Sequence, residues 1–236
     1  MPLENETPLI QTNELCRYFQ QSADIQVKAV DGVSIDIQPG EFTAIIGPSG
    51  SGKTTLLHLI GGLDKPTSGD VFLSGKNIAS LSPGELSDFR RDHIGFVFQA
   101  YNLIPVLSAE ENIEYVMLLQ GLDEKSRKQR VQETLKQVGL EDYANRRPNK
   151  LSGGQQQRVA VARAMASHPD IILADEPTAN LDSKTGVALL DVMKELNETL
   201  GMTFVFSTHD EKIMKRASRL IHVVDGKIDR DEKRTP

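Results

Sequence analysis

One short segment of the sequence has the residue types and spacing of a phosphate-binding loop. Residues 47–54 read Gly-Pro-Ser-Gly-Ser-Gly-Lys-Thr and match the pattern G-x-x-x-x-G-K-[ST]. Glycines let successive backbone N–H groups turn toward an anion, and a helix that starts next adds partial positive charge. In this arrangement Lys53 reaches the β- and γ-phosphates of a nucleotide, and the Thr54 hydroxyl binds Mg²⁺. The segment therefore predicts a nucleotide-binding loop rather than a glycine-rich turn before an ordinary helix.

A pair of carboxylates follows a short apolar run further along the chain. Residues 171–176 read Ile-Ile-Leu-Ala-Asp-Glu, which places Asp175 and Glu176 at the carboxyl end of a buried strand. Ligands of open α/β sheets bind at that edge. Asp175 is suited to orient Mg²⁺, directly or through water, and Glu176 to act as the general base that polarises an attacking water. The alternative is a solvated acidic turn after a strand.

A second candidate anion site lies at residues 151–155, Leu-Ser-Gly-Gly-Gln. The segment precedes a helical pattern through Val159, Ala162 and Met165, so Ser152 and the two glycines form the helix N-terminus with exposed N–H groups. The chain thus has one phosphate loop but two phosphate-binding helix ends. That imbalance suggests that two copies of the chain share each nucleotide.

The elements that must position these residues alternate between strands and helices. Phe42–Ile46 predicts a strand that stops at the phosphate loop, and the next helix ends at Gly61. Ser108 and Glu111 form a capping box before a helix. The remaining predicted elements are a strand pattern at Val33, Ile35 and Ile37, a helix through Val131, Leu135 and Val138, strands at 171–174 and 203–207, a helix through Val187, Leu190, Met193 and Leu196, and a hairpin at Asp225-Gly226. This order predicts an α/β core interrupted by a helical insertion.

Composition narrows the class of protein. The chain has 236 residues, a formal net charge of −6 and 39% hydrophobic residues, and its pI is about 5.4. The acidic balance argues against a broad nucleic-acid surface. The single cysteine, Cys16, cannot form an internal disulfide, and residues 1–6 lack the apolar core of a secretory signal. No apolar run is long enough to cross a membrane, so we expect a cytosolic protein whose contact with a membrane comes through a partner.

Taken together, these motifs resemble, in order and spacing, the nucleotide-binding subunit of an ABC transporter from Leu9 to about Asp229. Gln99, Asn180-Leu181-Asp182 and His209 belong to the same pattern. In detail the chain is similar to the lipoprotein-release, macrolide-export and cell-division branch (LolD/MacB/FtsE). The segments that carry this finer resemblance are residues 61–69, 90–99, 102–105, 151–158 and 182–186.

The resemblance implies the fold and its boundaries. We expect a P-loop NTPase (RecA-like) ABC nucleotide-binding domain with a small antiparallel β subdomain and an inserted helical subdomain. The single domain would cover residues 1–236, with the catalytic core at about 1–98 and 165–229 and the helical subdomain at about 100–164. The short charged tail, residues 229–236, is expected to be disordered.

Roles for four further residues follow only from this resemblance. Gln99 would contact Mg²⁺ and the lytic water, whereas alone it reads as a surface glutamine after a strand. Asp182 would cross the dimer interface beside the other subunit's phosphate loop, or it simply caps the next helix. His209 would hydrogen-bond the γ-phosphate, although a single histidine is more often structural. Phe19, or the adjacent Tyr18, would stack on adenine; the alternative is packing within a strand.

The same resemblance defines the remaining site residues. Residues 151–155 would close on the γ-phosphate of the opposite subunit. The expected nucleotide-binding residues are Phe19, Gly47, Pro48, Ser49, Gly50, Ser51, Gly52, Lys53, Thr54, Thr55, Ser152, Gly153, Gly154, Gln155 and Asp182. The expected catalytic residues are Glu176, His209, Gln99 and Lys53, and the expected metal ligands are Thr54, Gln99 and Asp175.

The implied activity is hydrolysis of Mg·ATP coupled to transport. Two copies would sandwich two ATP molecules and drive a separate membrane permease of export or lipoprotein-release type. The permease would dock near Gln99–Leu107 and hold the chain on the cytoplasmic face of the inner or plasma membrane. The alternatives are a transmembrane signalling regulator, an importer cassette, and a soluble ATPase that acts on DNA or ribosomes. The sequence does not name the cargo.

Overall fold

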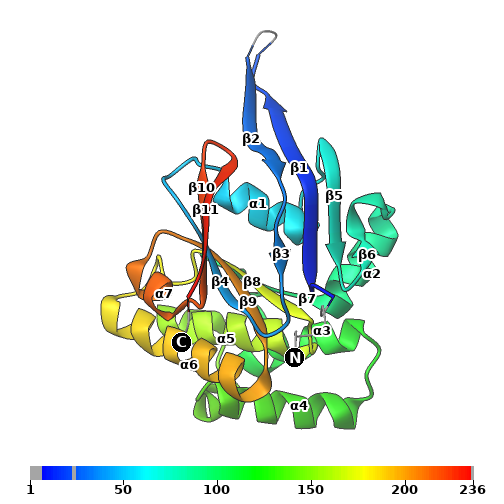
Figure 1. The fold of residues 1–236 in the computed structure, drawn as a ribbon. Helices are drawn as coiled ribbons and strands as arrows, with labels where there is room; N and C mark the ends of the chain where they lie inside the picture. Colours follow the sequence, from blue (N-terminus) through cyan, green and yellow to red (C-terminus); the bar gives the residue numbers. More distant parts are fainter. Residues whose placement is uncertain (1–6, 23–24, 235–236) are drawn as a thin grey trace, which may run out of the picture. The chain divides into compact units, whose positions relative to one another are not determined.

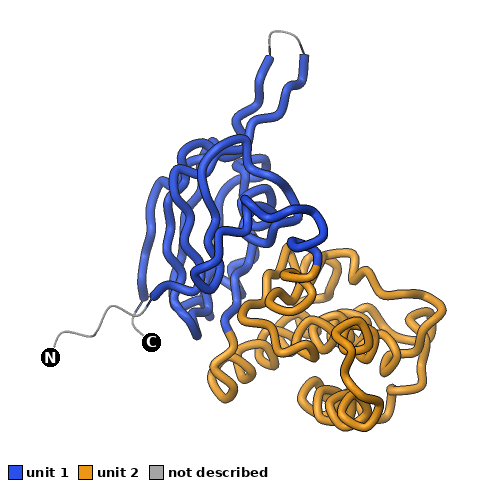
Figure 2. Tube along the Cα trace, turned by 90° about the vertical axis from the view of Figure 1, so that its right-hand side faces the viewer, with its two compact units in different colours: residues 1–87, 203–236 blue, residues 88–202 orange. Residues whose placement is uncertain are grey.

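The chain divides into two compact units in the computed structural model, which describes residues 7–22 and 25–234. The first unit comprises residues 1–87 and 203–236, and the second comprises residues 88–202 (Figure 2). Helix α2 (Pro83–His93) carries the chain from the first unit into the second. Within the described ranges, no helix combines the length and the apolar character that a membrane crossing requires.

An antiparallel sheet in the first unit is built around the long strand β1 (Figure 1). Its strands are β1 (Ile10–Gln20), β2 (Gln26–Val33), β3 (Asp36–Ile37), β5 (Ser68–Leu73) and β6 (Lys76–Asn77), followed by the 3₁₀ turn η1 (Ile78–Ser80). The alternation predicted at Val33, Ile35 and Ile37 is confirmed, since all three side chains are buried. The strand itself is interrupted, because the Thr12 hydroxyl donates to Val33 O and accepts from the Ile35 N–H at 3.0 Å each. The Thr12 side chain here takes the place of backbone hydrogen bonds between β1 and the segment from Val33 to Ile35.

A second set of strands in this unit runs mainly in parallel, in the order β11-β10-β4-β9. These are β4 (Phe42–Ile46), β9 (Thr203–Thr208), β10 (Arg219–Val224) and β11 (Lys227–Lys233), accompanied by helices α1 (Lys53–Ile60) and α7 (Glu211–Arg216). All residues of β4 and β9 are buried, as the continuous apolar runs predict. The Phe42 ring packs 5.5 Å from that of Phe204 and 4.6 Å from that of Phe206, between centroids.

The C-terminal tail corrects one expectation. The predicted hairpin at Asp225-Gly226 is present, with φ of 48° and 77° at its two turn residues. However, the predicted disorder from residue 229 is wrong for the described part, because β11 continues to Lys233 and pairs antiparallel with β10. The tail is ordered by backbone pairing and by one buried cation, which composition does not reveal. Residues 235–236 lie outside the described residues.

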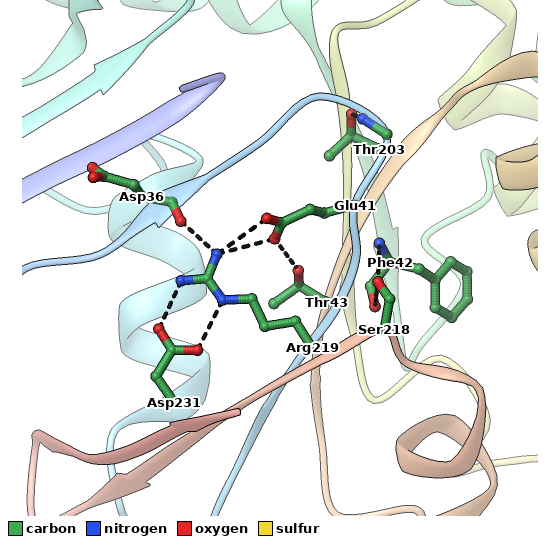
Figure 3. A network of polar contacts seen from close by, with 9 residues as sticks. Asp36, Glu41, Phe42, Thr43, Thr203, Ser218, Arg219 and Asp231 are labelled. Atoms are coloured by element: carbon green, nitrogen blue, oxygen red, sulfur yellow. Dashed lines mark hydrogen bonds and ion pairs between the residues drawn. The ribbon is translucent and has the colours of Figure 1, made fainter. Parts of the chain in front are cut away.

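That cation is Arg219, the centre of a polar network on β10 (Figure 3). Its guanidinium forms a two-pronged pair with Asp231 at 2.8 and 2.7 Å. It also donates to Glu41 at 3.0 Å and to the Asp36 backbone oxygen. The Arg219 side chain is only 7% exposed, so these acceptors compensate for its burial. The network joins β11 to the segments around β3 and β4.

The second unit places a parallel strand pair against helices. β7 (Ile94–Phe98) pairs with β8 (Ile171–Asp175). Its helices are α3 (Ala109–Leu119), α4 (Glu124–Gln137), α5 (Gly153–Ala166) and α6 (Ser183–Leu200), with 3₁₀ turns η2 (Glu141–Tyr143) and η3 (Pro148–Lys150). The predicted capping box at Ser108 and Glu111 is present. Gly95 lets α5 approach β7, since a Cβ there would lie 2.4 Å from the Ala164 backbone oxygen.

The expected fold class is confirmed: an α/β P-loop domain with an antiparallel β subdomain and an inserted helical part. The domain boundaries given above remain a prediction.

Candidate nucleotide-binding site

The predicted phosphate loop connects β4 to α1. Its glycines at 47, 50 and 52 have φ of 154°, 78° and 104°, and two of them are required by space as well. A Cβ on Gly47 would lie 2.1 Å from the Val223 backbone oxygen, and one on Gly52 would lie 2.0 Å from that of Ala29. Larger residues at either position would force the backbone of the loop or its neighbour to shift.

Lys53, the first residue of α1, points back into this loop. Its Nζ donates to the backbone oxygens of Gly47 and Pro48 at 2.9 and 2.8 Å, and the residue is 8% exposed. The N-cap of α1 is Gly52, which supplies no side-chain cap, and the first turn has no acidic residue. The first N–H groups of α1 and the Lys53 ammonium are therefore suited to bind an anion.

The strand register brings His209 to the same edge as the loop. β4 and β9 are parallel, with Ile46 opposite Thr208, so Gly47 and His209 both follow the last paired residues. Thr54 Oγ1 lies 3.4 Å from Ser207 Oγ of β9. Pro48, Ser49, Gly50, Thr54 and His209 are exposed, and Thr55 is half-buried. This edge presents a hydroxyl, an imidazole and the loop to solvent.

The two candidate adenine-stacking rings differ in their contacts. Phe19, near the end of β1, is 40% exposed, and the Arg17 guanidinium carbon lies 4.4 Å from its ring centroid. Arg17 is held in turn by Asp64 at 2.8 Å. Tyr18 instead donates its hydroxyl to Asp31 at 2.5 Å, and this bond raises the pKa of Tyr18. The open ring of Phe19 can accept a further planar group.

A second group of predicted residues meets at the edge of β7 and β8. Phe98 lies opposite Asp175 in the parallel register, so Gln99 and Glu176 follow the two strands side by side. Glu176 has a left-handed backbone, with φ of 45°. Asn180 connects the two segments: its Nδ2 donates to Gln99 O at 3.0 Å, and its Oδ1 accepts from Gln99 Nε2 at 3.4 Å.

The predicted helix start at Ser152 is confirmed. Its hydroxyl accepts from the Gln155 N–H at 3.3 Å, and the Gln155 side chain accepts from the Ser152 N–H at 2.9 Å. Gly154 is buried, and a Cβ there would lie 2.1 Å from Thr185 Cγ2 of α6. Gly153 sits beside the Tyr101 hydroxyl. The two glycines therefore also have a packing role.

Asp182 is the N-cap of α6, the structural alternative considered above. Its Oδ1 accepts from the N–H groups of Lys184 and Thr185 at 3.0 and 3.1 Å, and Oδ2 accepts from the Thr185 hydroxyl. These bonds, that of the Thr185 hydroxyl first, lower the pKa of Asp182. Asp182 is exposed, so a residue that caps this helix end is also accessible to another chain.

The donor chemistry fits Mg²⁺. Thr54, Gln99 and Asp175 all offer oxygen atoms, the ligands that Mg²⁺ prefers. Within residues 7–22 and 25–234, no group of three or more His, Cys, Asp or Glu side chains is placed to hold a metal ion. Mg²⁺ commonly binds through one or two protein ligands plus substrate phosphates.

Three residues make contacts around the β7–β8 edge that the sequence analysis does not predict. Asn180 appears there only as part of a motif, and Gln157 and Arg163 are given no role. Gln157 contacts the backbone on both sides of the β7–β8 edge, and Arg163 donates to the backbone oxygens of Tyr101 and Asn102. The sequence does not distinguish Gln157 and Arg163 from surface residues of α5, because polar side chains on a helix are usually exposed and their tertiary contacts are not visible in the sequence.

Comparison with known proteins finds similarity over nearly the whole chain. Residues 30–179 match the sequence profile of the ABC transporter family. The chain is 46% identical over 229 residues to an uncharacterized ABC transporter ATP-binding protein, MJ0796, from Methanocaldococcus jannaschii, covering 95% of this chain and 97% of that protein. A dimeric structure of the ATP-binding cassette MJ0796, in a post-hydrolysis state bound to ADP and Pi, superimposes with a TM-score of 0.88 and covers 96% of this chain and 99% of that one.

A second relative carries a permease in the same chain. The chain is 46% identical over 221 residues to the macrolide export ATP-binding/permease protein MacB of Hyphomonas neptunium. The match covers 94% of this chain but only 34% of MacB.

Proposed function

This chain belongs to the ABC transporter family as an ATP-binding, ATP-hydrolysing protein, and from that premise we propose how its residues carry out the reaction. The observation that carries the proposal is the loop from Gly47 to Gly52, against which the Lys53 ammonium lies and after which α1 begins without a side-chain cap. Such a loop binds the phosphates of ATP.

Each site residue has a defined role in this proposal. Lys53 exchanges its two backbone acceptors for the β- and γ-phosphate oxygens, and His209 donates to the γ-phosphate. Glu176 accepts a proton from the attacking water, while Gln99 orients that water. Phe19 stacks on adenine with its exposed face. Catalysis thus depends on positioning and charge stabilisation, as in other phosphoryl transfers.

Mg²⁺ would be held by Thr54, Asp175 and Gln99 together with phosphate oxygens. When bound, it neutralises negative charge on the phosphates of ATP. The oxygen donors of these three side chains support this assignment.

Two chains would share each nucleotide. Ser152, Gly153, Gly154 and Gln155 at the start of α5 would contact the γ-phosphate held by the other chain, and Asp182 would lie beside that chain's phosphate loop. The dimeric structure of the similar cassette MJ0796 supports a dimer. A closed C2 dimer makes both sites equivalent.

The partner would be an integral membrane permease of export or lipoprotein-release type. Similarity to MacB, whose name joins an ATP-binding part with a permease, supports such a partner. Large side chains are exposed in the second unit at Val106, within the predicted docking segment Gln99–Leu107, and on α3 at Tyr115, Leu118 and Leu119. Through this partner the chain would lie on the cytoplasmic face of the membrane.

Substitution of Glu176 tests the proposed reaction. Glu176→Gln removes the proton acceptor but keeps the shape of the side chain, so we expect ATP turnover to fall about 10²–10⁴-fold. ATP binding, measured with a fluorescent analogue, should be retained. Glu141→Gln, an exposed carboxylate on η2, is the matched control and should hydrolyse ATP like the wild type. Undiminished turnover in Glu176→Gln would overturn the role of Glu176.

A further inference from the structure

Gln157 is a fully buried amide in the second turn of α5. Its exposed fraction is 0%. The side-chain Nε2 donates two hydrogen bonds, to Phe98 O at 3.3 Å and to Pro177 O at 2.9 Å. Both acceptors are backbone carbonyls, so the NH₂ group must face them, since the amide oxygen would be repelled there.

These two carbonyls flank the residues to which catalysis was assigned. Phe98 immediately precedes Gln99, and Pro177 immediately follows Glu176. Within the described residues, the ladder between β7 and β8 ends at the pair Phe98 and Asp175. One amide from α5 therefore spans the two chain segments at the point where their ladder stops.

The backbone conformation of Glu176 depends on its surroundings, which include the hydrogen bond from Gln157 to Pro177 O. A left-handed φ of 45° is strained for a glutamate and persists only when its surroundings hold it. The turn that follows is closed by the Ala179 N–H to Glu176 O at 3.2 Å. Gln157 adds the hydrogen bond to the carbonyl between these two residues. It thereby restricts rotation of the Pro177–Thr178 peptide, which begins one residue after Glu176.

The other end of the same amide makes no such bond. Gln157 Oε1 is buried and has no hydrogen-bond partner among residues 7–22 and 25–234. A buried acceptor without a partner lowers stability, and so offsets part of what the two donated hydrogen bonds contribute. The arrangement is therefore poorly explained as a stabilising contact alone.

We propose that Gln157 is a positioning residue for hydrolysis, which holds the backbones of Gln99 and Glu176 at their working separation. The proposal rests on the catalytic roles proposed above for these two residues. Gln157 does not itself reach the reacting atoms in this proposal. It acts through the Phe98 and Pro177 carbonyls.

The test compares Gln157→Met with Gln120→Met. Methionine keeps the length of the side chain and removes both hydrogen bonds that the amide donates. Gln120 is the matched control because its Nε2 also contacts two backbone oxygens, those of Arg91 and Ser167 at 3.5 and 3.4 Å, as well as Asp92 Oδ1 at 3.4 Å. These contacts lie nearer the other ends of β7 and α5. For Gln157→Met we expect kcat to fall about 10–100-fold, with the Kd for ATP within about twofold of the wild type. Gln120→Met should leave both unchanged.

A second variant tests the donor itself. In Gln157→Glu the carboxyl can donate only when protonated, and burial beside carbonyl oxygens raises its pKa. Its kcat relative to the wild type should therefore increase as the pH falls, whereas Gln120→Glu should show no such trend. If Gln157→Met does not fold, the pH profile of Gln157→Glu still tests whether the donor at position 157 affects kcat.

The outcomes separate two failures. If the wild type hydrolyses ATP and Gln157→Met matches it, or if Gln157→Glu shows no pH trend, Gln157 is not a positioning residue. If Glu176→Gln is as active as the wild type, the proposed function of Glu176 fails, and the inference about Gln157 fails with it.

Discussion

Adjacent aromatic residues on β1 show how contacts separate two candidates for one role. The Phe19 ring is exposed on one side and covered by Arg17 on the other, whereas the Tyr18 hydroxyl is bonded to Asp31. Arg17 is itself bound to Asp64, so the cation that lies over the Phe19 ring is anchored.

We expect Phe19→Ala to raise the Kd for ATP about tenfold, because stacking of a base on an aromatic ring contributes about 1–3 kcal/mol. Tyr18→Ala should have a much smaller effect. Titration of each variant with a fluorescent ATP analogue measures the difference. If Tyr18→Ala has the larger effect, adenine stacks on Tyr18 instead.

Prediction from the sequence succeeds for single residues when spacing alone defines the geometry. The loop at Gly47–Thr54 is of this kind, because its glycines and lysine act within eight consecutive positions. Gln157 is not, because its two acceptors are 59 and 20 residues away in the sequence. No local pattern marks such a residue before the strands are placed.

At the scale of elements, helix starts and tight turns were predicted well. The caps at Ser108, Ser152 and Asp182 each need only a side chain and the next three residues, so the sequence contains the whole interaction. The continuation of β11 beyond residue 228 was missed, because Asp231 on this strand pairs with Arg219, a cation that also reaches Asp36 and Glu41 in distant segments. Charged composition alone indicated a disordered tail.

Asp231→Asn tests that explanation for β11. We expect it to lower the free energy of unfolding by about 1–2 kcal/mol at pH 7, because a hydrogen bond between charged groups contributes about 1.5–3 kcal/mol and Asp231 remains partly exposed to screening water. Urea unfolding followed by circular dichroism measures this change. Asp229→Asn, an exposed carboxylate on the same strand, should be neutral.

The effect should also depend on pH in one direction. The hydrogen bond from Arg219 lowers the pKa of Asp231 below its ordinary value of 3.8. A carboxylate with a lowered pKa stabilises the fold above its unfolded pKa, and this contribution is lost as the pH falls through the folded value. The difference between wild type and Asp231→Asn should therefore shrink between about pH 5 and pH 2. A constant difference across that range would contradict the pairing.

At the scale of the whole molecule, the predicted site residues are divided between the two units. Phe19, the phosphate loop and His209 belong to the first unit, and Gln99, Ser152, Glu176 and Asp182 belong to the second. No Pro- or Ser-rich linker marks the boundaries, and α2 runs across one of them, so composition could not indicate this division. Whether two chains share each nucleotide is tested by measuring ATPase activity when residues on different chains must act together.

Mixing two inactive variants provides that test. Lys53→Met removes the cation of the phosphate loop, and Ser152→Asp keeps a good N-cap on α5 but places negative charge against a phosphate. Each variant alone should be inactive. In a mixed dimer, Lys53 of one chain meets Ser152 of the other at one intact site. Equal mixing makes half of the dimers mixed, each with one of two sites intact, so we expect about a quarter of the wild-type ATPase activity to return.

The necessary control is a chain that carries both substitutions. When it is mixed with Lys53→Met, no combination of chains contains an intact site, and activity should stay absent. If the two single variants likewise fail to restore activity when mixed, while the wild type dimerises with ATP, each chain completes its own site. Ser152 would then act on the phosphate bound by its own chain, and the proposed exchange of α5 N-termini between subunits would be wrong. Restored activity would instead require that Ser152 and Lys53 from different chains meet at one nucleotide.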